Sequence, residues 1–133
     1  MKTLVLGVVL LFAAVGSAQA AADLDRSFPA DASIPFERLS AAVSADFIDP
    51  TSSQFKKMSR HIQDGRGEVI CGWVNAKNSM GGYTPFYPFH VTIDNLKATV
   101  GEHYDDEMLA PMVLLSFEWT GCLKPLGIKK PAS

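Results

Sequence analysis

The segment from Cys71 to Phe89 constrains the fold more than any other part of the chain. It reads CGWVNAKNSMGGYTPFYPF, in which a strand-like apolar pattern leads through a loop rich in asparagine and glycine to a second, aromatic stretch. Residues 78–82 have the composition of a turn, because glycine and asparagine adopt positive φ at little cost. Since strand-like segments flank this turn, the chain is predicted to contain an antiparallel β-hairpin.

The five-residue loop also predicts the register of that hairpin. It places Lys77 opposite Tyr83, Trp73 opposite Tyr87, Cys71 opposite Phe89 and Val69 opposite Val91. All of these pairs would share one face of the sheet, where aromatic and β-branched pairs each contribute about 0.2–1 kcal/mol. Pro85 and Pro88 cannot donate to a ladder, so residues 83–88 are predicted to form an edge or an irregular segment.

Four further segments have the patterns of regular elements. One face of an amphipathic helix is predicted from four apolar residues: Phe36, Leu39, Val43 and Phe47. Ser33 would cap this helix, and Asp49-Pro50 would end it. Strands are predicted over residues 54–62 and 97–101. Residues 111–122 are apolar enough for a helix or a strand, and the helix is favoured.

Together these elements predict a single α+β domain over residues 33–123. A small antiparallel sheet of three or four strands would be packed by an N-terminal and a C-terminal helix, with one disulfide. The polar residues 21–32 are expected to form a flexible arm. Residues 124–133, which hold two prolines and three lysines, are expected to form a C-terminal tail.

The N-terminus has the features of a secretory signal peptide over residues 1–20. Lys2 is followed by an almost uninterrupted apolar run over residues 4–15, and Ala18-Gln19-Ala20 fits the A-x-A cleavage pattern. The run is shorter than the roughly 20 apolar residues of a membrane-spanning helix. Cleavage is predicted after Ala20, with Ala22 as the alternative. The mature chain is therefore expected to be periplasmic or secreted and to lack a membrane span.

Cys71 and Cys122 are the two cysteines of the chain. In an oxidising compartment an isolated pair typically forms one disulfide, and closing so long a loop stabilises by about 4 kcal/mol on the chain-entropy model. The alternative is a pair of reactive or metal-binding thiols. Because two distant thiols make neither a C-x-x-C motif nor a complete zinc set, the disulfide is favoured.

Charge and histidine spacing narrow the classes of function. Removing residues 1–20 from 133 leaves 113, and the loss of Lys2 changes the formal net charge from −2 to −3. Without a basic run, nucleic-acid binding is not expected. His61, His90 and His103 lack the spacing of a metal site, so neither a metal nor a cofactor is predicted. The acidic run 105–107 is better explained as a helix start than as a calcium loop.

The loop from Asn75 to Tyr83 is the strongest candidate site. Its amides, its lysine, its serine and the backbone N–H groups that glycine leaves exposed suit an anion, a sugar or a peptide carboxylate. The presence of Gly81 and Gly82 in this loop is explained by the backbone conformations that a turn requires. Phe86, on the face opposite Trp73, is the best candidate for an exposed aromatic contact. The candidate binding residues are Asn75, Lys77, Asn78, Ser79, Tyr83 and Phe86.

Two motifs of this chain resemble those of a group of small exported proteobacterial proteins of uncharacterised function. The first, Asp-Pro-x-Ser-x-x-Phe, is matched by residues 49–55. The second, Cys-Gly-x-Val-Asn-x-Lys-Asn-Ser-x-Gly-Gly-Tyr, is matched by residues 71–83. The resemblance covers roughly residues 45–90. It implies export and a shared fold, and it brings no activity, substrate or catalytic residue.

The leading functional prediction is a non-enzymatic binding module that uses the 75–83 loop to hold a protein, peptide or glycan. One alternative is a small hydrolase or transferase built around Lys77, Ser79 or a histidine. A second alternative is a structural component of the cell envelope. A histidine or carboxylate within hydrogen-bond reach of Ser79 or Lys77 would favour the enzyme.

Overall fold

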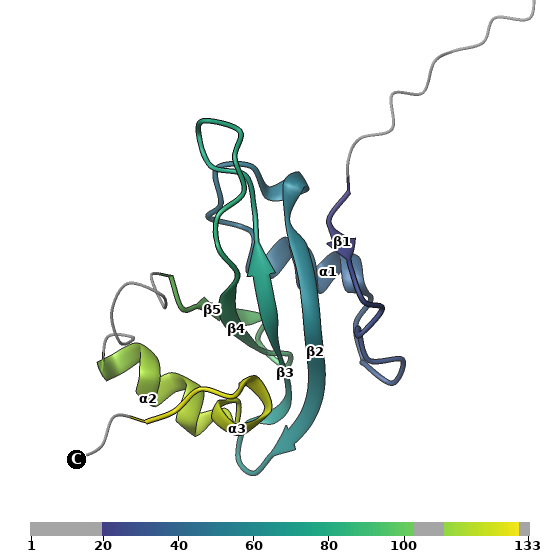
Figure 1. Ribbon diagram of the computed structural model, residues 1–133. Coiled ribbons are helices and arrows are strands. Elements are labelled where there is room, and N and C mark those ends of the chain that lie inside the picture. Colours follow the sequence, from purple (N-terminus) through teal and green to yellow (C-terminus); the bar gives the residue numbers. More distant parts are fainter. Residues whose placement is uncertain (1–19, 103–110, 131–133) are drawn as a thin grey trace, which may run out of the picture.

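The computed structural model describes residues 20–102 and 111–130 and has an α+β fold with helices on both faces of one sheet (Figure 1). The predicted signal peptide, His103 and the acidic run 105–107 lie outside the described residues, apart from Ala20. Within the described ranges, every helix is too short or too polar to cross a membrane.

The sheet has five strands that lie side by side in the order of the sequence. They are β1 (Ala22–Asp23), β2 (Gln54–Gln63), β3 (Gly67–Asn75), β4 (Tyr87–Thr92) and β5 (Lys97–Val100). The strands β2 to β5 form an antiparallel meander, as predicted. The short β1 adds a parallel edge, so the sheet is mixed and has one strand more than expected.

That fifth strand comes from residues 21–32, which were predicted to be a flexible arm. Ala22 donates its N–H to the Ser53 carbonyl at 3.0 Å. Further along, the Asp25 carboxylate accepts from the Lys57 N–H at 2.9 Å, and the Ser27 hydroxyl accepts from the Met58 N–H at 2.8 Å. Short polar side chains thus satisfy the open edge of β2, and sequence periodicity carries no signal for such contacts.

Each face of the sheet has its own apolar core. α1 (Phe36–Val43) covers one face, where its Leu39 and Val43 pack with side chains from β2 to β4. α2 (Pro111–Trp119) and α3 (Leu123–Leu126) cover the other. Because both faces are covered, β3 is buried along nearly its whole length.

The helix predicted between the cap Ser33 and the stop at Asp49-Pro50 forms, but the observed helix ends before its apolar stripe does. α1 ends at Val43, and the Ser44 hydroxyl donates back to the Ser40 carbonyl at 2.6 Å. Phe47 still packs against the core, but from a loop. The short 3-10 turn Pro50–Ser52 then leads into β2. Asp49-Pro50 therefore does not end the helix, because serine side chains compete for the backbone first.

Ser33 does not cap α1 as predicted. Pro35 occupies the cap position, and no side chain caps the helix. Ser33 instead donates its backbone N–H and its hydroxyl to the carboxylate of Glu68 on β3. Arg60 of β2 also donates to this carboxylate, at 2.8 Å, so Glu68 is buried with three donors. Those donors hold the pKa of Glu68 below its usual value, although burial opposes them.

Residues 111–119 of the segment 111–122 form a helix, which resolves the alternative between helix and strand. α2 ends at Trp119, and Gly121, with a φ of 74°, turns the chain so that Cys122 leads into α3. Cys122 forms the predicted disulfide with Cys71, with a Cα–Cα distance of 5.8 Å. The predicted tail contributes to this core, because Leu126 and Ile128 are buried against the disulfide.

The hairpin register predicted from the loop is correct at its tip and wrong in the ladder. Lys77 and Tyr83 form the expected bridge. Below it, Trp73 lies opposite Pro88, Cys71 opposite His90 and Val69 opposite Thr92. Between the bridge and the ladder, the three residues 84–86 lie opposite only two residues, 75 and 76. The second half of the hairpin therefore carries one extra residue. Pro85 cannot donate to the ladder, and this irregularity accommodates it.

The one-residue shift exchanges the faces of every side chain on β4. Phe89 was predicted on the disulfide face but lies in the α1 core, with its ring centroid 5.5 Å from that of Phe55. Tyr87, paired with Val74, shifts in the same way. His90 takes the place beside Cys71, on the disulfide face.

Candidate functional site

The tip of the β3–β4 hairpin is a loop held by its own hydrogen bonds. The Asn78 N–H donates to the Gly82 carbonyl at 2.8 Å, and the Gly81 N–H donates to the Asn78 carbonyl at 3.0 Å. The Asn78 side-chain oxygen accepts from the N–H groups of Met80 at 3.0 Å and Gly82 at 3.2 Å. Asn78 therefore has a structural role, and the loop conformation is established before any ligand arrives.

Several side chains of this loop point to solvent. Met80 is 93% exposed and Tyr83 is 45% exposed, and Ser79 is also exposed. The ammonium of Lys77 lies 5.8 Å from the centroid of the Tyr83 ring, within the range of a cation–π contact. The tip thus exposes a flexible apolar side chain, Met80, and a polar aromatic ring, Tyr83.

The base of the loop is attached to the turn that precedes β2. The Ser52 hydroxyl accepts from the Lys77 N–H at 2.8 Å and donates to the Asp49 carbonyl at 2.7 Å. The two motifs noted in the sequence therefore meet in space. Sequence reasoning did not connect them, since nothing in either motif indicates its partner.

Asn75 and Phe86 are less available than predicted. Asn75 is only 6% exposed, and its side-chain amide donates weakly to the Thr84 carbonyl at 3.4 Å. Its Oδ1 atom is buried and has no hydrogen-bond partner among the described residues. Phe86 is partly buried, with the ammonium of Lys56 3.9 Å from its ring centroid. Lys56 rather than solvent therefore occupies one face of that ring.

A cavity of about 360 Å³ lies at the base of the same hairpin. Its walls come from three parts of the chain. These are the loop after α1, the ends of β3 and β4 next to the hairpin loop, and Glu102, which lies shortly after β5. The lining residues are Asp46, Phe47, Ile48, Val74, Asn75, Ala76, Lys77, Asn78, Thr84, Tyr87 and Glu102. Sequence reasoning missed the contributions of the loop after α1 and of Glu102, because neither lies near the hairpin in sequence.

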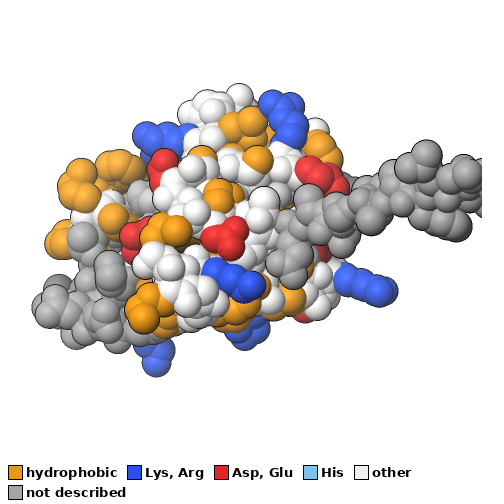
Figure 2. Space-filling model, turned by 90° about the horizontal axis from the view of Figure 1, so that it is seen from above, with side chains coloured by type: hydrophobic (Ala, Val, Ile, Leu, Met, Phe, Trp, Pro, Cys, Tyr) orange, Lys and Arg blue, Asp and Glu red, His pale blue; other side chains and the backbone are white. Residues whose placement is uncertain are grey.

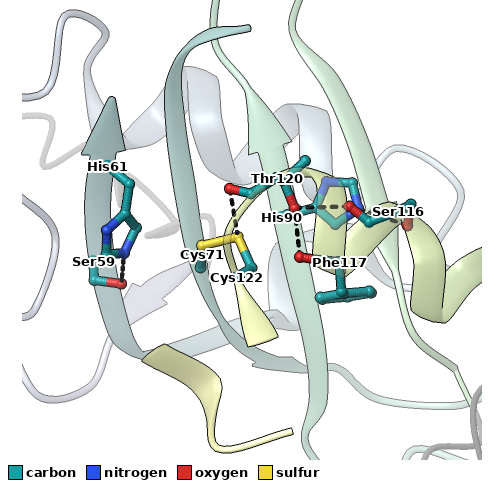
Figure 3. Close-up of a disulfide and its surroundings, with 8 residues drawn as sticks. All are labelled: Ser59, His61, Cys71, His90, Ser116, Phe117, Thr120 and Cys122. Atoms are coloured by element: carbon teal, nitrogen blue, oxygen red, sulfur yellow. Dashed lines mark hydrogen bonds between the residues drawn. A yellow bond between two sulfur atoms is a disulfide. The ribbon is translucent and has the colours of Figure 1, made fainter. Parts of the chain in front are cut away.

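Histidines and serines pair on the disulfide face of the sheet (Figure 3). Ser59 and His61 of β2 lie on one side of the disulfide, with 2.8 Å between the hydroxyl and Nε2. His90 lies on the other side, with its Nε2 2.9 Å from the Ser116 hydroxyl. Both cysteines are fully buried between them.

His90 is held in its neutral form by its surroundings. Burial, and to a lesser extent the charges of Arg66 and Lys97, lower the pKa of His90 to about 4. Its Nδ1 atom has no hydrogen-bond partner among the described residues, and its ring packs edge-on against Phe117 with 4.7 Å between centroids. This environment suits a core histidine under α2.

The enzyme alternative gains no support from the described residues. No histidine or carboxylate there lies within hydrogen-bond distance of the Lys77 ammonium or the Ser79 hydroxyl. Neither serine–histidine pair is completed by a carboxylate within the described ranges. Among the same residues, no three histidine, cysteine, aspartate or glutamate side chains lie close enough together to hold a metal ion.

Figure 2 views the molecule from the end toward which the hairpin tip points. Among the side chains drawn in colour, positive and negative groups are interspersed with small hydrophobic ones, and no large patch of one charge forms.

Comparisons with protein-family models, with curated proteins and with solved structures find no match to this chain.

Proposed function

We propose that the chain is a non-enzymatic, exported binding module that recognises a protein partner through the tip of its β3–β4 hairpin. The observation that carries the proposal is the combination of a 93% exposed Met80 with a loop closed by Asn78. A methionine exposed to that degree contributes nothing to the core. Methionine adapts to irregular partner surfaces, and a preformed loop loses little conformational entropy on binding.

Tyr83 supports the same proposal. Tyrosine combines apolar contact area with a hydroxyl, and it is enriched at protein interfaces. The neighbouring Lys77 ammonium adds a charged group at the edge of the contact. Export of the module rests on the predicted signal peptide, with which the buried disulfide is compatible.

A matched pair of substitutions tests the proposal. Met80→Ser removes the exposed side chain at the tip, and Met112→Ser removes a 75% exposed methionine from α2 on another part of the molecule. With the immobilised protein as bait for periplasmic extract, a captured partner should be retained by the wild type and by Met112→Ser. The loss expected for Met80→Ser is at least about tenfold in affinity, as for an interface anchor.

Equal capture by all three proteins would remove the tip from the contact. If no protein is captured even by the wild type, the structural envelope alternative becomes the better explanation.

A further inference from the structure

The cavity at the base of the hairpin has a mostly apolar floor. Phe47, Val74 and Tyr87 line it, and Val74 is fully buried within the α1 core. A volume of about 360 Å³ is near the lower end of the range for ligand pockets in proteins. The size and the floor suit a ligand no larger than a short peptide, with at least one apolar side chain.

The rim of this cavity carries charges of both signs. Asp46 and Glu102 supply two carboxylates, and Lys77 supplies one ammonium. Among the described residues none of the three forms an ion pair, although the Lys77 ammonium lies 5.8 Å from the centroid of the Tyr83 ring. A ligand with a cationic and an anionic end, joined by an apolar body, is complementary to this rim and floor.

Asn75 adds a second, independent indication. It lines the cavity and is more than nine-tenths buried, yet its Oδ1 atom accepts no hydrogen bond from the described residues. A buried acceptor without a hydrogen bond destabilises the fold, because it has lost its bonds to water. A ligand N–H that reached Asn75 would remove that destabilisation, which favours a ligand rich in such donors.

We propose that this cavity binds a short zwitterionic peptide with an apolar side chain. The ligand ammonium is held by Asp46 and Glu102, its carboxylate by Lys77, and its apolar side chain by the floor around Phe47. This site shares Lys77 with the contact proposed for the hairpin tip, but Met80, which carries the tip proposal, does not line the cavity. The two proposals can therefore fail separately.

The dipeptide Phe-Leu is a suitable probe, titrated into the purified protein by calorimetry. Its N-acetylated form lacks the ammonium, and its C-terminal amide lacks the carboxylate. Saturable binding of Phe-Leu is expected, and each blocked form should bind at least about tenfold more weakly through the loss of one charge-assisted hydrogen bond.

Two variants assign each end of the ligand. In Lys77→Gln, Phe-Leu should bind more weakly and amidation of the peptide should cost no further affinity. In Asp46→Asn combined with Glu102→Gln, acetylation should cost no further affinity. Met112→Ser is the matched control, because Met112 does not line the cavity, and it should bind Phe-Leu as the wild type does. Circular dichroism and the thermal midpoint verify that each variant is folded.

Three results would overturn the proposal. Phe-Leu could fail to bind the folded wild type; the blocked peptides could bind as tightly as Phe-Leu; or Lys77→Gln could still discriminate against the amide. Loss of partner capture by Met80→Ser together with any of these results would leave the tip proposal standing alone.

Discussion

At the scale of single residues, glycine at position 72 is required for packing. A Cβ at this position would lie 2.7 Å from Met58 Cγ and 2.7 Å from Phe89 Cζ, well inside van der Waals contact. β3 and β4 can therefore carry the Phe89 ring over the backbone of β3 only if residue 72 has no side chain.

Gly72→Ala should lower the free energy of unfolding by about 1–3 kcal/mol, the range for overpacking a core. Urea denaturation followed by circular dichroism measures the change. Gly82→Ala is the control, since its Cβ would meet nothing closer than 3.9 Å and should leave stability nearly unchanged. A Gly72→Ala protein as stable as the wild type would mean that Phe89 has room to move aside.

His90 makes stability depend on pH. Its folded-state pKa, lowered to about 4, lies below the ordinary value near 6.5, so the unfolded chain binds more protons between these two values. Stability is therefore complete above about pH 6.5 and falls as the pH drops toward 4. The loss is about 3 kcal/mol by linkage.

Unfolding measured at pH 7 and pH 4 for the wild type and for His90→Leu tests this dependence. The variant should lose most of the change between the two pH values. The pH dependence that remains in the variant should come from carboxylates such as Glu68. Because the pKa of Glu68 is lowered in the folded state, the fold loses further stability as the pH falls below the ordinary pKa of a glutamate. An unchanged pH profile in His90→Leu would show that His90 does not titrate within the fold.

At the scale of elements, the disulfide attaches α2 and α3 to the sheet. Cys71 and Cys122 are separated by 51 positions, and both are fully buried. α3 has only four residues and is too short to be stable in isolation. Its position therefore depends on the disulfide and on the apolar contacts of Leu126 and Ile128 around it.

Replacing both cysteines by serine should reduce the free energy of unfolding by about 4 kcal/mol on the chain-entropy estimate for this loop. Hydrogen exchange should show faster exchange in α2 and α3 than in the wild type, while β2 and β3 keep their slow amides. Uniform loosening of the whole chain would contradict this local role. The single substitution Cys122→Ser, measured under reducing conditions beside the reduced wild type, separates loss of the bond from loss of the thiol.

The elements also show where sequence patterns suffice. The strand over residues 54–62 was predicted from the local pattern of the sequence, and β2 confirms it. β1 was missed because two residues carry no periodicity. α1 was predicted too long, because its apolar stripe continues to Phe47 although its backbone does not.

At the scale of the whole molecule, two cores on opposite faces of one sheet explain the pattern of β3. Val69, Cys71 and Trp73 pack beneath α2 and α3, while Ile70 and Val74 pack beneath α1. The sequence predicted this division of β3 correctly, because alternation along one strand is a local property. The division of β4 was predicted wrongly, because it depends on how β4 is aligned with β3.

The amino-acid sequence by itself determined the class of fold, most of the strands and the disulfide, and it favoured a helix over residues 111–122 without excluding a strand. Each of these follows from local patterning or from the presence of only two cysteines. Tertiary structure alone decided the hairpin register, the edge strand β1 and the cavity at the base of the hairpin. Those features depend on contacts between distant segments, such as Ser52 with Lys77, and on the extra residue beside Pro85. Local propensities do not encode such contacts.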